Sequence, residues 1–206
     1  MLLVLTGVTA ISVALLAFVN ELTKGPIAEA NVKTLNEALK QVLPALNNNP
    51  VAESDTIFSE KGGKKTVDFI IYPAKEGDKW VGSAVQATSM GFGGELKLLV
   101  GFDSEGKIYN YSLLSHAETP GLGSKAADWF KEGNKGSIKG MNPGETPLTV
   151  SKDGGQIDAI TASTITSRAF LKAVNAAYSA YNGSGDATTG ASQRAVVEPA
   201  DAISAN

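Results

Sequence analysis

The chain begins with a long apolar run. Residues 2–19 contain no charged side chain. A run of about 18 residues reaches the lower end of the length that an α-helix needs to span a bilayer. A cleaved signal peptide is the alternative, but no basic segment precedes the run, no Ala-x-Ala-like site follows it, and it is longer than a typical signal core. The pattern therefore predicts a retained transmembrane anchor over residues 1–22.

Small residues recur at helical spacing within this anchor. Gly7, Ala10, Ala14 and Ala17 would share one face of a helix. Such a face lets another transmembrane helix approach closely, so we expect it to contact a partner helix, although small residues are also common in membrane spans in general. Because Lys24 is the only basic residue close to the span, the bias of positive charge does not set its orientation.

The next apolar pattern also has a helical period. Apolar side chains recur every three or four positions over residues 32–46, and the segment Asn47 to Pro50 should end that helix. Pro26 should separate it from the anchor, because a proline inside a helix removes a hydrogen bond and clashes with the preceding turn. One face of this second helix should pack against the rest of the protein.

Runs with strand-like composition follow. The expected strands cover residues 56–58, 66–72, 80–88, 95–102, 107–114, 148–151 and 156–160. The strands at 95–102 and 107–114 should form a hairpin around Asp103 to Gly106. The Gly-rich segment Lys61 to Lys65 lacks the spacing of a phosphate-binding loop, so we expect a solvated hairpin turn there.

The remaining helices are predicted at residues 124–131 and 165–181. The second should bury one face, made of Phe170, Val174, Ala177, Tyr178 and Tyr181. Beyond Asn182 few apolar residues occur, which predicts a mobile tail. The expected fold is α+β, with a transmembrane helix followed by an antiparallel sheet flanked by helices. The chain would divide into an anchor (1–22), a domain (23–182) and a tail (183–206).

Composition excludes several functions. The net charge of −3 argues against nucleic-acid binding. The chain has no cysteine, so it can hold no disulfide, thiolate metal site or cysteine-bound iron–sulfur cluster of its own. His116 is the single histidine, which excludes a multi-histidine metal site. We find no set of nucleophile, base and orienting group, so we expect no independent catalytic centre and no resident metal.

Four small or hydroxyl residues, Thr161 to Thr164, lie between the last predicted strand and the last predicted helix. Hydroxyl side chains at a helix start cap its free N–H groups. A helix N-terminus is also an anion site, because unpaired N–H groups and the helix dipole both favour negative charge. The segment is therefore either a plain helix cap or a cradle for a phosphate.

A second feature is the loop His116 to Gly123, with the sequence His-Ala-Glu-Thr-Pro-Gly-Leu-Gly. Pro120 fixes its own φ, and Gly121 and Gly123 can adopt backbone angles that are closed to other residues. The loop is either an ordinary turn or a surface that presents N–H groups to a ligand. The Gly-rich segment Gly91 to Gly94 is equally consistent with a loop that leads into a strand and with a ligand contact.

Both features resemble motifs of FMN-binding domains. Residues Asp158 to Thr164 resemble the flavinylation motif Asp-x-x-(Ser/Thr)-Gly-Ala-(Thr/Ser), whose last residue carries FMN through a phosphoester bond. Ala162 replaces the usual Gly and Ser163 the usual Ala, and both remain small. The loop at residues 116–123 resembles the His-x-Glu-Thr-Pro-Gly-Leu-Gly loop of the same families. With the anchor, the whole chain resembles G subunits of Rnf electron-transport complexes.

The resemblance implies a set of site residues. Thr164 would be the covalent attachment point, and Asp158 would shape the turn or serve the modification. The other residues expected to contact FMN are Thr161, Ala162, Ser163 and Thr166 in the motif, and His116, Glu118, Thr119, Pro120, Gly121, Leu122 and Gly123 in the loop.

The resemblance also implies a function. The protein would relay electrons within a membrane complex that couples ferredoxin and NAD to ion translocation, without binding either itself, because it has no dinucleotide fingerprint. Its partners would be the other membrane and redox subunits, together with a flavin transferase for maturation. The soluble domain would lie on the extracytoplasmic side of the inner membrane. The alternatives are a C subunit of sodium-pumping NADH:quinone reductase, for which the chain is short, and a flavin-free membrane-tethered scaffold.

Overall fold

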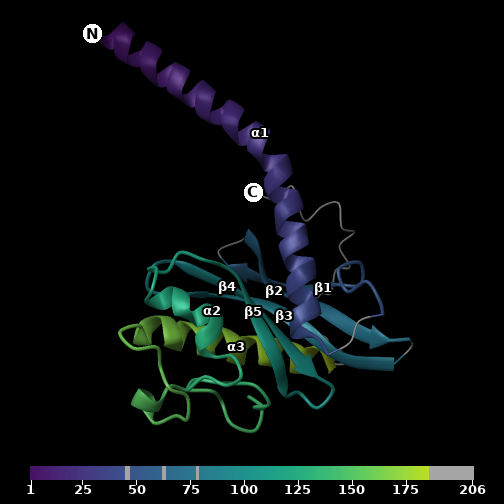
Figure 1. The fold of residues 1–206 in the computed structure, drawn as a ribbon. Coiled ribbons are helices and arrows are strands. Elements are labelled where there is room, and N and C mark those ends of the chain that lie inside the picture. Colours follow the sequence, from purple (N-terminus) through teal and green to yellow (C-terminus); the bar gives the residue numbers. More distant parts are fainter. Residues whose placement is uncertain (45–46, 62–63, 78, 186–206) are drawn as a thin grey trace. The chain divides into compact units, whose positions relative to one another are not determined.

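The computed structural model describes residues 1–44, 47–61, 64–77 and 79–185 of the chain. These residues divide into two compact units, with the boundary between Asn36 and Glu37. The first unit is helical and belongs to α1 (Leu2–Val42). The second holds the end of α1, the sheet and the remaining helices, and it has the predicted α+β architecture (Figure 1).

The helix α1 corrects one prediction. It runs without interruption from Leu2 to Val42, with Pro26 inside it, where the sequence predicted two separate helices. A proline removes one backbone hydrogen bond and crowds the preceding turn. An exposed helix tolerates this loss, because the freed carbonyl group can accept a hydrogen bond from water. The helix is long and apolar enough to cross a membrane.

The end of α1 packs within the second unit. Leu39 and Val42 are buried there. The backbone of the strand β4 (Glu95–Asp103) comes so close to this helix end that a Cβ on Gly101 would overlap the Val42 carbonyl oxygen. The Asn110 amide also donates to the Gln41 carbonyl oxygen at 3.1 Å.

Five antiparallel strands form the sheet, in the order β1-β2-β3-β4-β5. Their bounds are Asp55–Lys61, Lys64–Glu76, Lys79–Met90, Glu95–Asp103 and Ile108–His116. All five predicted strands of this region are confirmed, with longer bounds than the sequence indicated. Lys61 pairs with Lys64 at the end of the first hairpin, and the predicted turn between them, at residues 62–63, lies outside the described residues.

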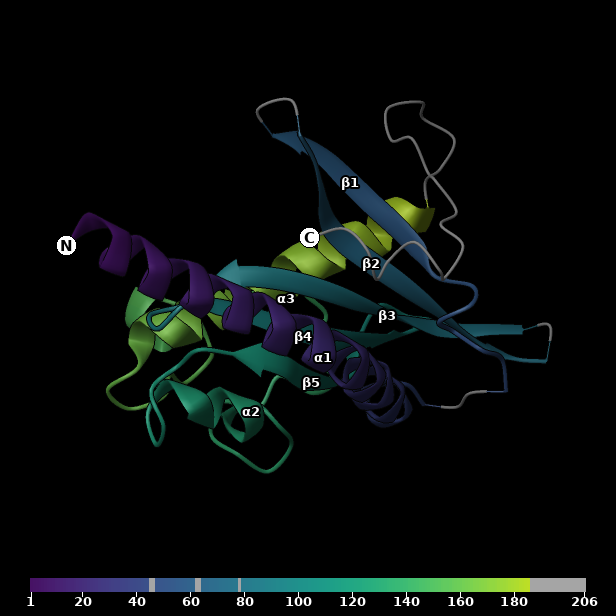
Figure 2. The same cartoon turned by 90° about the horizontal axis from the view of Figure 1, so that it is seen from above.

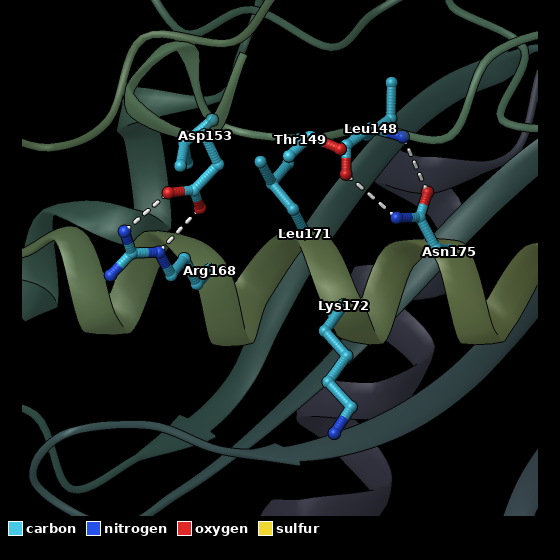
Figure 3. Close-up of a pocket in the computed structure, with 8 residues that line it drawn as sticks. Leu148, Thr149, Asp153, Arg168, Leu171, Lys172 and Asn175 are labelled. Carbon is cyan, nitrogen blue, oxygen red and sulfur yellow. Dashed lines mark hydrogen bonds and ion pairs between the residues drawn. The ribbon is translucent and has the colours of Figure 1, made fainter. Parts of the chain in front are cut away.

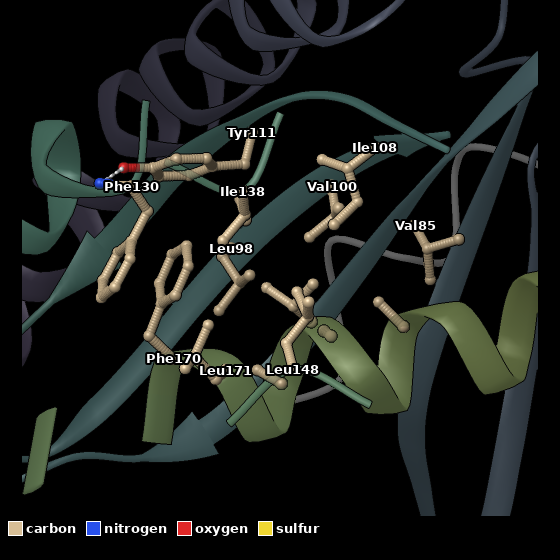
Figure 4. Packing of buried hydrophobic residues seen from close by; sticks show 14 of the residues in the cluster. Val85, Leu98, Val100, Ile108, Tyr111, Phe130, Ile138, Leu148, Phe170 and Leu171 are labelled. Atoms are coloured by element: carbon tan, nitrogen blue, oxygen red, sulfur yellow. Dashed lines mark hydrogen bonds between the residues drawn. The ribbon is translucent and has the colours of Figure 1, made fainter. Parts of the chain in front are cut away.

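The long helix α3 (Thr164–Gly185) covers one face of the sheet (Figures 1 and 2). Successive residues of a strand point to opposite faces, so Val100 and Phe102 join the core under α3 while Gly101 faces the end of α1. Phe170 on α3 stacks on Phe130 with ring centroids 4.3 Å apart (Figure 4). This packing fixes the start of α3 relative to the sheet.

Tyr111 anchors the short helices to the same core. It lies beside Phe170, and its hydroxyl donates to the Ala126 carbonyl oxygen at 2.7 Å and accepts from the Phe130 N–H (Figure 4). Its burial raises the pKa of the Tyr111 hydroxyl well above its ordinary value. The short helices η1 (Gly123–Lys125) and α2 (Ala126–Trp129) confirm the helix predicted at residues 124–131.

Two predicted strands are wrong. Residues 148–151 and 156–160 meet only at a single parallel bridge between Val150 and Ile157, and Ser151–Asp153 forms the 3-10 helix η2 instead. Gly154 has a left-handed φ of 83°, and a Cβ on Gly155 would overlap the Thr149 carbonyl oxygen. These glycines reverse the chain too tightly for a ladder to extend.

The end of the domain also differs from its prediction. α3 continues to Gly185, so residues 183–185 are helical where the sequence predicted a tail. The rest of the predicted tail, residues 186–206, lies outside the described residues.

Candidate functional site

The predicted acceptor segment is a tight turn that leads into α3. Ala162 has φ = 62° and is the one non-glycine residue with a positive φ among those described. That left-handed conformation explains why the motif usually has glycine at this position, since a Cβ is disfavoured there. The turn closes through the Ser163 N–H, which donates to the Ile160 carbonyl oxygen at 3.0 Å. It therefore presents the following residues at the beginning of the helix.

Ser167 holds this turn in place. Its buried hydroxyl donates to the Ser163 carbonyl oxygen at 3.0 Å and accepts from the Ile160 N–H at 2.9 Å. One side chain thus joins the first turn of α3 to the segment before it. We did not predict this role for Ser167, because a serine inside a helix carries no sequence signal for such a contact.

Thr164 lies at the first position of α3 and is half-buried. Its Oγ1 accepts a hydrogen bond from Lys152 Nζ at 3.3 Å. The first N–H groups of a helix have no acceptor within it, and the first turn of α3 contains no acidic side chain. The Thr164 hydroxyl therefore lies at the positive end of the helix dipole, beside a cation.

The other hydroxyl groups of the motif lie in different surroundings. Ser163 and Thr166 are buried, with 8% and 1% of their surfaces exposed, whereas Thr161 is exposed. Thr166 Oγ1 donates to Glu118 Oε2 at 2.8 Å, so the hydrogen atom of that hydroxyl already has an acceptor inside the protein. The motif residues are thus adjacent in sequence but differ in access to a ligand.

Glu118 joins the two predicted motifs. Its carboxylate is buried, and Oε1 accepts from the backbone N–H groups of Phe92 at 2.8 Å and Gly93 at 3.1 Å. Oε2 accepts from Thr166 on α3. One side chain therefore holds together the segment at residues 91–94, the loop at residues 116–123 and the start of α3.

Glycines around Glu118 make room for this carboxylate. A Cβ on Gly91 or on Gly123 would overlap a Glu118 oxygen, and a Cβ on Gly93 would overlap the Ala117 carbonyl oxygen. The three glycines are therefore explained by close packing at the base of the loop. Any contact they make with a ligand would come in addition to that role.

The rest of the loop is a surface turn. Gly121 has φ = 76°, and its N–H donates to Ser124 Oγ at 2.9 Å. His116 is exposed, and its Nδ1 accepts from the Glu118 N–H at 3.2 Å. Thr119, Pro120 and Leu122 are exposed as well. The structure thus brings the loop to the start of α3 and leaves its tip accessible.

Large apolar side chains are exposed on the segments that Glu118 joins. Phe92 is 70% exposed, Leu122 is 42% exposed and Ile165, next to Thr164, is 52% exposed. The isoalloxazine ring of a flavin is flat and largely apolar, so such side chains suit it. A threonine hydroxyl, a cation and exposed apolar groups together fit the parts of FMN.

The segment that carries Lys152 is fixed on both sides. Arg168 on α3 forms a two-pronged ion pair with Asp153, with distances of 2.7 and 2.6 Å. The hydrogen bond from Arg168 lowers the pKa of the Asp153 carboxyl group below its ordinary value. On the other side, Ser151 Oγ contacts Asp158 Oδ1 at 3.3 Å. Asp158 therefore shapes the loop next to the motif.

A pocket of about 240 Å³ lies farther along α3 and includes this ion pair at its rim (Figure 3). Asn175 closes it by exchanging two hydrogen bonds with the Leu148 backbone, both 2.9 Å long. Neither Thr164 nor the loop at residues 116–123 lines this pocket. The residues predicted to bind FMN therefore lie outside this pocket.

Two family models match parts of this chain. Residues 91–179 match the sequence model of the FMN-binding domain, and residues 3–42 match that of the RnfG N-terminal region. The first match includes the loop, the turn and the first part of α3. The second favours a G subunit over the alternative C subunit.

Individual relatives extend the match over most of the chain. The G subunit of the ion-translocating oxidoreductase complex of Stutzerimonas stutzeri is 35% identical over 164 residues, which are 75% of this chain and 68% of that protein. The corresponding protein of Escherichia coli K12 is 36% identical over 172 residues, covering 81% and 82%. The corresponding protein of Salmonella typhi is 35% identical over 173 residues, with the same coverage.

The apolar helix and the family together indicate a single-pass membrane protein. Two sequence models and the individual relatives point to the same assignment. With its apolar helix, its FMN-binding domain and relatives that match most of its length, the chain belongs to the family of G subunits of ion-translocating oxidoreductase complexes.

Proposed function

We propose that Thr164 carries FMN through a phosphoester bond and that the domain relays electrons within the complex. The observation that carries this proposal is the position of the Thr164 hydroxyl, at the N-terminus of a long helix and 3.3 Å from Lys152 Nζ. Both surroundings favour an anion on that oxygen. A plain helix cap would need neither the lysine nor the exposed turn.

Accessibility supports Thr164 over its neighbours. Ser163 and Thr166 are buried, and Thr166 already donates to Glu118. Thr161 is exposed, but it precedes the left-handed turn at Ala162 and lies outside the helix. Ser163 is therefore a less favourable acceptor than Thr164. Thr161 would contact the phosphate only from outside the helix.

The loop at residues 116–123 and the exposed Phe92 and Ile165 would accommodate the flavin ring. Glu118 would set the position of all three segments without touching the ring, because its carboxylate is buried. FMN supplies the electron-transfer chemistry when it is bound, and the protein supplies position and electrostatics. The other subunits of the complex would then be its redox partners.

Attachment would need a separate enzyme. The Thr164 oxygen would attack a phosphorus atom of FAD, forming the Oγ1–P bond while the anhydride bond breaks and AMP leaves with the bonding electrons. The hydroxyl proton must pass to a base. Lys152 contacts the acceptor as a hydrogen-bond donor and not as a proton acceptor. The base would therefore come from a flavin transferase, acting on the extracytoplasmic side.

The test of this proposal uses the full chain, produced with the transferase. Wild type should retain flavin fluorescence after denaturing electrophoresis, and mass spectrometry should place the FMN increment on Thr164. Thr164→Ala should abolish both signals and Thr164→Ser should keep part of them. Thr146→Ala, at an exposed threonine outside both motifs, is the matched control that should keep them. An increment on Ser163 or Thr166, or a protein that never carries flavin, contradicts the proposal. The second outcome would favour the flavin-free scaffold.

Two further experiments test maturation and orientation. Protein made in a host without the transferase should be free of flavin and should gain it only when enzyme and FAD are added. Spontaneous attachment from FAD alone would refute the need for the enzyme. Because the chain has no cysteine, a Ser104→Cys variant, in the exposed turn of the β4–β5 hairpin, should react with a membrane-impermeant thiol reagent from the extracytoplasmic side.

A further inference from the structure

We infer that Lys152 is the cation that pairs with the phosphodiester formed on Thr164. The inference deepens the proposed function and rests on it. The sequence offered no signal for it, because Lys152 is separated from the motif and belongs to neither of the two recognised segments. Only the folded chain places the Lys152 ammonium group beside the Thr164 hydroxyl.

The residues before and after Lys152 in the chain, Ser151 and Asp153, are both held in place by hydrogen bonds. Asp153 is held by the two-pronged ion pair with Arg168, and the Ser151 N–H donates to the Ile157 carbonyl oxygen at 2.8 Å. The 3-10 helix η2 therefore has little freedom at either side of Lys152. The side chain is exposed but starts from an anchored backbone, so less entropy is lost when the ammonium group binds an anion.

Two cations lie near Thr164, Arg168 and Lys152, and only Lys152 is available to bind the phosphodiester. Arg168, one helical turn after Thr164, is already committed to Asp153. Within the part of the chain that the structure describes, Lys152 forms no ion pair, and its contact is the acceptor hydroxyl itself. An ammonium group has three donors, so two remain available. A phosphodiester on Thr164 Oγ1 places charged oxygens two bonds from the atom that Lys152 already contacts.

Lys152 is consequently a positioning residue for the cofactor. It would neutralise the single negative charge of the phosphodiester together with the N-terminus of α3, and so restrict rotation about the new bond. Charge-assisted hydrogen bonds of this kind are stronger and shorter than neutral ones.

The test compares lysine reactivity in the flavin-free and flavin-loaded full chain. Both forms are treated with an acetylating reagent in detergent, and acetylation is quantified by mass spectrometry. Loading should slow acetylation of Lys152 by about fivefold, because the reactive species is the neutral amine and an anion beside the ammonium group makes its proton harder to lose. Lys172, exposed on α3 and without an ion pair in the described residues, is the internal control and should react equally in both forms.

A second measurement covers the variants Lys152→Gln and Lys152→Arg, with Lys172→Gln as the matched control. Attachment of FMN should raise the melting temperature of wild type and Lys152→Arg more than that of Lys152→Gln, whereas the flavin-free forms should melt alike. The control should behave as wild type in both forms.

The outcomes separate this inference from the proposed function. If wild type carries FMN on Thr164 but Lys152 reacts equally in both forms, the inference is wrong and the proposed function stands. The same holds if Lys152→Gln gains as much thermal stability on loading as wild type. If wild type carries no FMN on Thr164, both fall together.

Discussion

Removal of the Glu118 carboxylate is the most informative perturbation of this domain. Glu118 is 6% exposed and accepts three hydrogen bonds, from two backbone N–H groups and from the Thr166 hydroxyl. Because these donors belong to the segments at residues 91–94 and 164–166, Glu118→Ala should separate both segments from the loop at residues 116–123. We expect a loss of stability and a loss of flavin attachment.

The loss of stability in Glu118→Ala depends on whether each of the three hydrogen-bond donors finds another acceptor once the carboxylate is removed. A buried donor left without an acceptor costs about 1–3 kcal/mol. The N–H groups of Phe92 and Gly93 belong to exposed residues, so water can replace the carboxylate there at the low end of that range. The Thr166 hydroxyl is buried, so the loss of its acceptor should cost a free energy at the high end of that range. The sum is about 3–5 kcal/mol for Glu118→Ala.

Glu118→Gln should cost less. Its amide oxygen can still accept from the two backbone N–H groups, and its NH₂ group can donate to the Thr166 hydroxyl once that hydroxyl rotates. The variant then loses chiefly the advantage of a charged acceptor, which is about 1–2 kcal/mol. The order of stability should therefore be wild type, then Glu118→Gln, then Glu118→Ala.

Denaturant unfolding of the full chain in detergent, followed by tryptophan fluorescence, measures these differences. The midpoints should shift with an unchanged slope. The matched control is Glu145→Ala, at an exposed glutamate, which should stay within about 0.5 kcal/mol of wild type. If Glu118→Ala unfolds at the same denaturant concentration as the control, the carboxylate does not hold the three segments together and the reasoning fails.

Four other predictions follow from single features. Ala162→Gly should stabilise the protein by about 0.5–1 kcal/mol in urea unfolding, because relief of the left-handed strain exceeds the entropy cost of glycine; a loss of stability would refute the strain. Gly101→Ala should destabilise it by about 3 kcal/mol, because the new Cβ meets the Val42 backbone, and an unchanged urea midpoint would contradict that close approach. Gly7→Leu should reduce copurification of partner subunits in a pull-down more than Leu15→Ala does, and equal recovery would mean that the small-residue face is irrelevant. Arg168→Gln should destabilise the protein above the ordinary pKa of Asp153, and the difference from wild type should vanish as pH falls through the lowered pKa of that carboxyl group; a pH-independent difference in melting temperature would rule this out.

The sequence by itself determined the elements whose signals are local. An uncharged apolar run predicts the long N-terminal helix, and alternating or β-branched runs predict the five strands, because periodicity within a few residues reflects which side of an element is buried. The segment that resembles the flavinylation motif and the loop at residues 116–123 were also found from sequence, since each is contiguous. The proposal that Thr164 is the acceptor rests on that resemblance.

Only the tertiary structure decided how these pieces meet. The sequence pattern did not predict that α1 continues through Pro26 or that residues 148–151 and 156–160 form no strands. Both outcomes depend on hydrogen bonds that the order of apolar and polar residues does not contain. The contacts of Glu118 with Thr166 and of Lys152 with Thr164 join residues far apart in the chain. Such pairs follow from how α3 packs on the sheet, because the packing of the core under α3 fixes where the start of that helix lies.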